Sequence, residues 1–253
     1  MEKLEMIEKL ARLLRQAKCI AVLTGAGMST ESGIPDYRST DGLYRTLTSE
    51  EVFDIYRFEH NPADFYDVIG PLYCSIVEAQ PNAGHLALHE LEARCGKTVC
   101  VATQNIDGLH QKAESRIVCE VHGTMATLTC LKCGRHYESG QFLPLFKEGK
   151  TLHCEACDGI LKPDITFYGE SLPQKAFMDA YNAFRHCDLA LVLGTSLVVY
   201  PAASLPMERA TGTPLAIVNR SATSADREAA LVIHEGIGDV LPAAVSLIPD
   251  ADA

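Results

Sequence analysis

Four cysteines in two closely spaced pairs have the residue type and spacing of a metal site. Cys130 and Cys133 form the first Cys-x2-Cys pair, and Cys154 and Cys157 form the second. Two such pairs are typical of a single tetrahedral zinc ion bound by thiolates. Because all four ligands come from the protein, no coordination position remains for water or substrate. The cysteines therefore predict one structural zinc ion rather than a catalytic metal.

Small and polar residues follow several apolar runs that have the length of buried strands. These positions are Gly25, Ala26 and Gly27 after residues 20–23; Gln104, Asn105 and Asp107 after residues 98–102; His122 after residues 117–121; and Gly194, Thr195 and Ser196 after residues 188–193. In an open α/β sheet, ligands bind at the carboxyl ends of the strands. Glycine turns there bind phosphate, and a histidine with a pKa near 6.5 suits general-base catalysis. Taken singly, each residue is also explained as a turn residue, a helix cap or a structural histidine.

The first glycine turn departs from the dinucleotide-binding fingerprint. After Gly25 and Gly27, the sixth position of the motif holds Thr30, and the next glycine is Gly33. A standard nicotinamide-dependent dehydrogenase is therefore not predicted. The stretch ends in a constrained loop, residues 33–38, which carries an anion, an aromatic ring and a cation and which suits contact with a nucleotide.

Alternating strand and helix patterns must position these residues. Strands are expected at residues 20–23, 98–102, 117–121, 188–193, 214–218 and 231–234, with helices at residues 3–17, 81–96, 174–186 and 201–210. This alternation predicts the α/β class, with a Rossmann-like, doubly wound parallel sheet. We expect the corresponding domain to comprise residues 1–40, 76–123 and 163–253.

Two segments do not follow this alternation. Residues 41–75 are rich in aromatic side chains, with Pro62 and Pro71 interrupting the run, and they predict a small helical module with an aromatic core. Residues 124–162 contain the four cysteines and predict the zinc-binding module. Together these segments are expected to form a smaller zinc-ribbon plus helical domain, inserted into the larger one.

Composition limits the classes of partner and compartment. The net charge of -11 disfavours nucleic acid as the main partner. It suits a cationic protein tail, although a solvated acidic surface explains it better. No apolar run reaches the roughly 20 residues that cross a membrane, so no membrane partner is expected. Ten cysteines and a charged N-terminus without a signal peptide predict a reducing, cytoplasmic location.

Taken together and in this order, the motifs resemble the sirtuin family of NAD-dependent protein deacylases, of the bacterial or archaeal type. The resemblance covers nearly the whole chain. The matching segments are residues 25–29 (GAGMS), 32–36 (SGIPD), 103–107 (TQNID), His122 with Gly123, the four cysteines, residues 194–196 (GTS) and Asn219. It implies a Rossmann-like large domain and a zinc-containing small domain, with NAD and an acetyl-lysine protein bound in the cleft between them.

The resemblance also implies a reaction. The acyl-lysine carbonyl oxygen attacks the nicotinamide ribose of NAD, nicotinamide leaves, and the acyl group ends on ADP-ribose. The nearest alternative is ADP-ribosyl transfer to protein, which occurs in the same family. Two unrelated alternatives are a nicotinamide-dependent oxidoreductase and a zinc-ribbon module that binds nucleic acid or a protein partner.

Residue roles follow from the matching positions. His122 is expected to act as the general base toward a ribose hydroxyl, and Asn105 and Asp107 are expected to position ribose and nicotinamide. The predicted cofactor-binding set also includes Gly25, Ala26, Gly27, Asp36, Tyr37, Arg38, Gln104, Ile106, Gly194, Thr195, Ser196, Asn219 and Arg220. The substrate peptide is expected to pair as a strand with a segment that contains Thr166, Phe167, Tyr168, Gly169, Glu170 and Leu172.

Two positions depart from the family pattern, and a third comparison concerns the acyl group. Tyr37 and Tyr168 stand where the family usually has phenylalanine, and each added hydroxyl group needs a partner or water. Family members that prefer succinyl groups carry a Tyr-x-x-Arg pair, whereas Tyr66 is followed at the third position by Ile69. Without a cation, burying a carboxylate is costly, so an acetyl or another neutral acyl group is predicted.

Overall fold

A six-stranded parallel sheet forms the larger part of the protein. The computed structural model describes residues 3–36 and 50–251. The strand order is β3-β2-β1-β7-β8-β9, and every neighbouring pair is parallel. The strands are β1 (Cys19–Thr24), β2 (Thr98–Thr103), β3 (Ile117–Glu120), β7 (Leu189–Leu193), β8 (Leu215–Val218) and β9 (Leu231–Ile233). The predicted doubly wound α/β sheet is confirmed.

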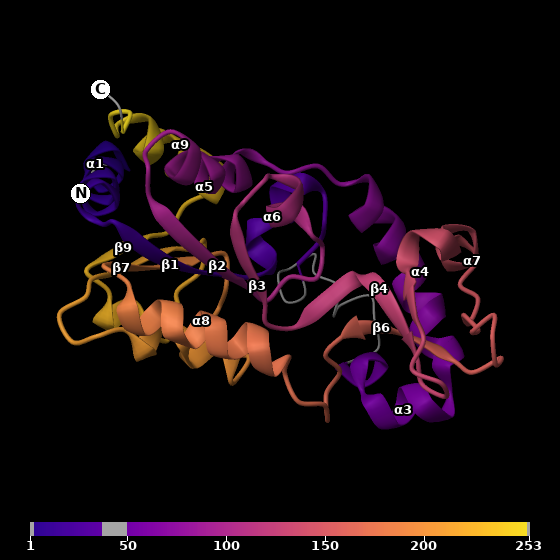
Figure 1. The fold of residues 1–253 in the computed structure, drawn as a ribbon. Coiled ribbons are helices and arrows are strands. Elements are labelled where there is room, and N and C mark those ends of the chain that lie inside the picture. Colours follow the sequence, from indigo (N-terminus) through magenta and orange to yellow (C-terminus); the bar gives the residue numbers. More distant parts are fainter. Residues whose placement is uncertain (1–2, 37–49, 252–253) are drawn as a thin grey trace.

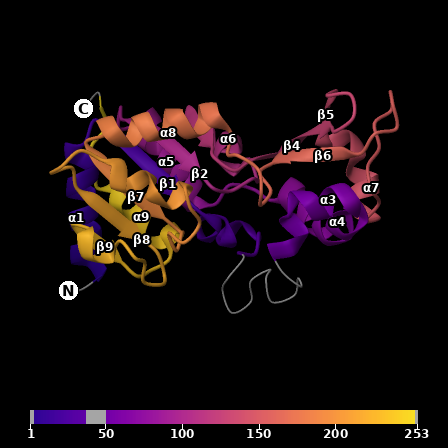
Figure 2. The ribbon, with the colours of Figure 1, turned by 90° about the horizontal axis from the view of Figure 1, so that it is seen from below.

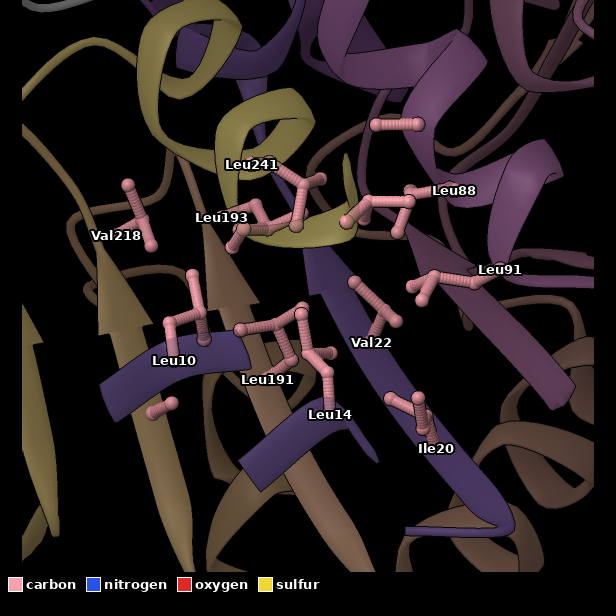
Figure 3. Packing of buried hydrophobic residues seen from close by; sticks show 14 of the residues in the cluster. Leu10, Leu14, Ile20, Val22, Leu88, Leu91, Leu191, Leu193, Val218 and Leu241 are labelled. Atoms are coloured by element: carbon pink, nitrogen blue, oxygen red, sulfur yellow. The ribbon is translucent and has the colours of Figure 1, made fainter. Parts of the chain in front are cut away.

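Helices cover both faces of this sheet (Figure 1). One face carries α1 (Lys3–Gln16), α5 (Ala83–Ala93) and α9 (Ile237–Ser246), and the other carries α8 (Gln174–His186) and the 3-10 helix η5 (Ala202–Glu208). Side chains alternate along each strand, so Val22 and Leu191 face α1, α5 and α9, as Figure 3 shows for this cluster. Leu23 and Ala190 face the opposite helices. Burial on both faces explains why these strands read as continuous apolar runs.

The order of the strands creates a crevice beside β1. From β1 the chain proceeds outward to β2 and β3, whereas β7, β8 and β9 extend in the opposite direction. Gly25 N donates to Leu193 O at 3.1 Å, and Gly27 N donates to Gly194 O at 2.9 Å, so the turns after β1 and β7 touch. Doubly wound sheets bind ligands at such a topological switch point.

A three-stranded antiparallel sheet forms a second lobe, set apart from the first in Figure 2. Its order is β5-β4-β6, and helices pack beside it around an aromatic core. The elements are β4 (Gly123–Cys130), β5 (His136–Glu138), β6 (Leu161–Ile165), α3 (Ile55–His60), α4 (Pro62–Glu78) and α7 (Leu143–Lys147). We call this part the small lobe, and the six-stranded sheet with its helices the large lobe. We propose that they correspond to the two domains expected from the sequence, although β6 runs across the boundary placed at residue 163.

The remaining elements are single turns. They are η1 (Ala26–Met28), η2 (Thr30–Ser32), η3 (Glu50–Phe53), α6 (Leu109–Lys112), η4 (Ser139–Phe142) and η6 (Asp226–Glu228). Within residues 3–36 and 50–251, none of the helices has the length and apolar character needed to cross a membrane.

One sequence expectation about the small lobe is wrong. Pro71 was expected to interrupt the helical module, but it lies inside α4, which continues to Glu78. Pro62 occupies the first turn of that helix, where the missing N–H costs nothing. Phe65, Tyr66, Ile69 and other side chains of α4 are buried, and this burial offsets the roughly 3 kcal/mol that an internal proline costs.

Candidate active site

A cavity of about 1510 Å³ lies where the carboxyl ends of the large-lobe strands meet the end of β6. It collects nearly all the residues that the sequence singled out. The predicted residues that line it are Gly25, Ala26, Gly27, Asp36, Gln104, Asn105, Ile106, His122, Thr166, Phe167, Tyr168, Gly169, Glu170, Leu172, Gly194, Thr195, Ser196, Asn219 and Arg220. Asp107 lines a smaller adjoining pocket. Tyr37 and Arg38 lie outside the residues that the structure describes.

Glycines allow the two turns on the floor of the cavity to touch. A Cβ atom on Gly27 would lie 2.9 Å from the Cα of Gly194. Gly194 itself has a φ of +63°, and a Cβ there would lie 2.4 Å from the backbone N of Met28. Any side chain at these positions would separate the turns. The floor is therefore bare backbone, which suits close contact with a phosphate group.

Gln104 joins the two halves of this floor. Its Nε2 donates to Thr195 Oγ1 at 3.0 Å and to the Thr24 carbonyl at 3.4 Å. A side chain from the end of β2 thus bridges the ends of β1 and β7.

Asn105 and Asp107 hold the loop that follows the first glycine turn. Asn105 Nδ2 donates to Gly25 O at 3.0 Å and to Ser29 Oγ at 3.1 Å. Ser29 Oγ in turn donates to Asp107 Oδ2 at 2.6 Å, and Leu109 N donates to Asp107 Oδ1 at 2.9 Å. Burial raises the pKa of Asp107, against the effect of these hydrogen bonds. The adjoining pocket beside Asp107 is only about 20 Å³.

Asn82 holds the same loop from the other side. Its Nδ2 donates to Met28 O at 2.8 Å and to Ser32 Oγ at 3.0 Å. Its Oδ1 accepts from the backbone of Gly84 and His85, so Asn82 also caps α5. The helix expected at residues 81–96 places Asn82 near its start. Its bond to a loop 50 or more positions away had no local signal.

His122 is oriented as a proton acceptor. Its Nδ1 lies 3.1 Å from the carbonyl oxygen of Gln104. A carbonyl can only accept, so Nδ1 carries the proton and Nε2 is left with a free lone pair. Burial lowers the pKa of His122, and the bond to Gln104 opposes this only in part. The ring is therefore neutral at pH 7, the form that a general base requires.

The segment after β6 forms the opposite wall of the cavity. Thr166 N donates to His122 O at 2.8 Å, which ties this wall to the histidine. Tyr168 N donates to Phe53 O at 2.7 Å, and Tyr168 O accepts from Ile55 N at 3.1 Å. In the described part of the chain, the backbone groups of Gly169 make no hydrogen bond. Tyr168 is 41% exposed, so water is available to its hydroxyl group.

A second apolar wall was missed by the sequence analysis. Val198, Val199, Tyr200 and Pro201 line the cavity together with Phe177 and Met178 of α8. Val198 and Tyr200 are exposed. The signal was an apolar run directly after the polar turn at residues 194–196, before the next helix.

The four cysteines meet at the far end of β4 from the cavity. Their sulfur atoms lie within 4.8 Å of one another, with Cys130 Sγ 3.5 Å from Cys157 Sγ and Cys133 Sγ 3.7 Å from Cys154 Sγ. A tetrahedral site with Zn–S bonds of about 2.3 Å has S–S separations of about 3.8 Å, so the four thiols fit a zinc ion. β4 begins at Gly123, beside His122, and ends at Cys130. Seven residues of strand span roughly 23 Å, so the metal is structural and remote from the chemistry.

Comparison with known proteins gives a consistent family match. A family model described as the Sir2 family matches residues 25–201. The chain is 42% identical over 238 residues to "NAD-dependent protein deacylase 2" of Archaeoglobus fulgidus, covering 93% of each sequence.

Solved structures show the same fold. A structure described as Sir2 with a deacetylated p53 peptide and 3′-O-acetyl-ADP-ribose is 36% identical, with a TM-score of 0.90 over 95% of this chain and 97% of that one. A second structure, described as Sir2 with a p53 peptide and NAD⁺, has a TM-score of 0.85 at 36% identity, over 93% of this chain and 95% of that one.

Proposed function

The chain belongs to the Sir2 family, and we propose on this basis that it is an NAD-dependent protein lysine deacetylase. It transfers the acetyl group of acetyl-lysine to ADP-ribose and releases nicotinamide. The observation that carries the proposal is the orientation of His122: its Nδ1 donates to Gln104 O, which leaves Nε2 unprotonated, and the residue lines the cavity shared by the glycine turns and the Thr166–Glu170 wall. The names of the relatives favour deacetylation over ADP-ribosyl transfer to protein.

NAD would extend along the carboxyl edge of the large sheet. Asn219 and Arg220, after β8, would meet the adenosine end, while the touching turns at Gly27 and Gly194 would receive the pyrophosphate. Gln104 and Asn105 would then lie near the nicotinamide ribose. This direction brings the reacting sugar to His122 and leaves the Thr166–Glu170 wall to the peptide.

Asp107 would anchor the carboxamide of nicotinamide in the adjoining pocket. At about 20 Å³ this pocket has room for roughly one water molecule, so the ring requires it to enlarge. Ser29 and Ile34 line the pocket and belong to the loop that Asn82 and Asn105 hold. We infer that this loop shifts when the nicotinamide end of NAD binds.

The acyl group is expected to be neutral, but the tyrosine comparison does not supply the reason. Tyr66 is buried among aromatic rings, and its hydroxyl group donates to Leu161 O, so it is a structural residue outside the cavity lining. Among the described residues that line the cavity, Arg220 is the one permanently charged cation, and it lies beside Asn219. A succinyl carboxylate near His122 would therefore find no described cation, at a considerable cost in desolvation.

The direct test is an acetyl-lysine peptide incubated with the protein, with and without NAD, and analysed by mass spectrometry. We expect loss of acetyl and appearance of acetyl-ADP-ribose only when NAD is present. His122→Ala should lower kcat by about 10²–10⁴-fold, the usual contribution of a general base. His186→Ala is the matched control, since the exposed His186 also bonds a carbonyl through Nδ1. Equal turnover by His122→Ala would remove its assigned role, and a mass gain of ADP-ribose on the peptide would favour the alternative.

We also propose that acetylated proteins, rather than nucleic acids or membranes, are the partners, and that the protein works in the cytoplasm. The net charge of -11 supports the first statement. The second rests on ten cysteines that form no disulfide within the described residues.

A further inference from the structure

We propose that Lys162 is a positioning residue for the acetylated peptide. It holds the turn at residues 167–170 in the conformation that presents the backbone of Gly169, which makes no hydrogen bond to the described residues, to the substrate. The inference rests on the proposed deacetylase function and deepens it, because it assigns a role to a residue that does not line the cavity itself.

The ammonium group of Lys162 is buried and fully bonded. Its side chain is 9% exposed. The Nζ atom donates to Ile165 O at 2.8 Å and to Pro163 O at 3.2 Å, and it lies 2.9 Å from Glu170 Oε2. An ammonium group has three N–H donors, and these three acceptors use them all. Nζ also lies 4.3 Å from the centroid of the Phe167 ring, a favourable cation–π distance.

Glu170 links the ammonium group of Lys162 to the backbone of the turn. Its Oε2 atom accepts from Phe167 N at 2.8 Å, while Glu170 N donates to Phe167 O at 3.0 Å. The two residues thus close a four-residue turn at both backbone groups of Phe167. Gly169 has a φ of +93° inside it, a conformation that favours glycine. Gly169 lines the cavity, so a peptide strand bound there can pair with its backbone.

The ring of Phe167 fixes the other side of the turn. Its centroid lies 5.1 Å from that of Phe65 and 5.2 Å from that of Phe58, within the aromatic core of the small lobe. Without Lys162, the partly exposed carboxylate of Glu170 loses its counter-charge and turns toward water. Phe167 N–H then loses its acceptor, while the ring stays anchored. We therefore expect a local loosening of the Thr166–Glu170 wall, called the peptide wall from here on, rather than loss of the fold.

The kinetic signature separates positioning from general stability. The peptide wall contains the turn at residues 167–170, whereas the predicted NAD contacts Gly27, Gln104 and Gly194 belong to the large lobe. Lys162→Met, which keeps the length and removes the charge, should raise the peptide KM and leave the KM for NAD unchanged. Loss of a charged hydrogen bond predicts an increase of about tenfold or more.

The experiment compares Lys162→Met and Lys162→Arg with Lys150→Met as the matched control. Lys150 makes an exposed ion pair with Glu148, so its replacement should change neither KM. Lys162→Arg should restore most of the peptide affinity, because it keeps the charge. A folded Lys162→Met protein with wild-type peptide KM would overturn the proposal, as would equal increases in both KM values.

Hydrogen–deuterium exchange of the free proteins separates this proposal from the proposed function. In Lys162→Met, the amides of Phe167 and Glu170 should exchange faster while those of β1 and β7 do not change; unchanged exchange at Phe167 would contradict the inference. If the wild-type protein fails to deacetylate, the proposed function fails and the exchange result still decides the structural claim. If Lys162→Met does not fold, Glu170→Gln replaces it, with faster Phe167 exchange expected and unchanged exchange again contradicting the inference.

Discussion

The two lobes that form the cavity are stabilised in different ways. The large lobe buries aliphatic side chains on both faces of six paired strands, among them Val22, Leu191 and Val218 on the face shown in Figure 3. The small lobe has three strands and a core of aromatic rings, among them Phe58, Phe65 and Phe146. The four cysteines of the predicted zinc site lie at its far end. The large lobe is thus stabilised by a hydrogen-bonded sheet with aliphatic packing on both faces, whereas the small lobe is stabilised by an aromatic core and the four-cysteine site.

This difference matters because each lobe supplies one side of the site. The ends of β1, β2 and β7 are fixed by a ladder of backbone hydrogen bonds. The wall at residues 166–170 is held by a few separate backbone hydrogen bonds and by side-chain contacts, such as Lys162 with Glu170 and Phe167 with Phe65. Damage to the small lobe should therefore appear first in peptide binding, and damage to the large lobe in overall stability.

Removal of zinc should produce the largest effect and is the strongest test of this comparison. Structural zinc sites contribute an apparent binding energy of about 10–16 kcal/mol, which is also folding energy. Chelation, or the Cys130→Ala substitution, should raise amide exchange throughout β4, β5 and β6 while β1 and β7 remain protected. Metal analysis should find one zinc ion per chain beforehand. An unchanged melting curve after verified zinc loss would show that the small lobe does not depend on the metal.

Truncation of one core side chain in each lobe should give similar losses of stability but different kinetics. Leu191→Ala should cost about 2–5 kcal/mol and Phe65→Ala about 3–5 kcal/mol, measured by urea unfolding. Phe65 touches Phe167, so Phe65→Ala should also raise the peptide KM. Leu191→Ala should leave that KM unchanged in the folded protein. The same KM change in both variants would contradict the division of roles between the lobes.

Acid should lower the free energy of unfolding of the large lobe through two buried histidines, His85 and His110, whose rings are in contact. They are the one such pair among the described residues. Burial lowers the pKa of His85 to about 4 and that of His110 to about 3, and their rings lie 4.7 Å apart. An unfolded histidine titrates near 6.5, so below that pH the unfolded state binds more protons. The stabilising contribution of the two neutral histidines should be fully present above about pH 6.5. As the pH falls toward 4, the free energy of unfolding should decrease by up to about 1.4 kcal/mol per pH unit for each histidine.

The check is urea unfolding of the wild type and His110→Gln across this pH range. The variant should show a shallower dependence on pH. Carboxyl groups such as Asp107, whose raised pKa acts in the opposite direction, are common to both proteins and cancel in the difference. Parallel curves would mean that the pKa of His110 is the same in the folded and unfolded states, and would contradict this prediction.

Local patterns predicted most of the fold and the floor of the site. The helix at residues 3–17 was predicted from the spacing of its apolar residues, although one of these, Leu4, is 62% exposed in the structure. Short apolar runs marked the strands because both sheet faces are covered. The four cysteines were predictive because metal ligation dictates their type and spacing.

The remaining features depend on contacts between distant segments. Pro71 stays helical because neighbouring side chains of α4 are buried, which a local rule cannot anticipate. Lys162 reads as an exposed lysine in sequence, and only the fold shows that three acceptors surround it. The wall at residues 198–201 belongs to the cavity because β7 ends beside β1.

The cap of α5 has a geometric consequence for the loop at residues 28–32, which follows the first glycine turn. The amide group of Asn82 is planar, so the direction of its Nδ2 is set once its Oδ1 accepts from the first turn of α5. Its Nδ2 donates to Met28 O and Ser32 Oγ, so the orientation of α5 determines where these two acceptors lie. Leu88 and Leu91 pack α5 into the hydrophobic core. The position of the loop is therefore fixed by a helix that is itself anchored in the core. A displacement of α5 would therefore move this loop with it and change the shape of the cavity.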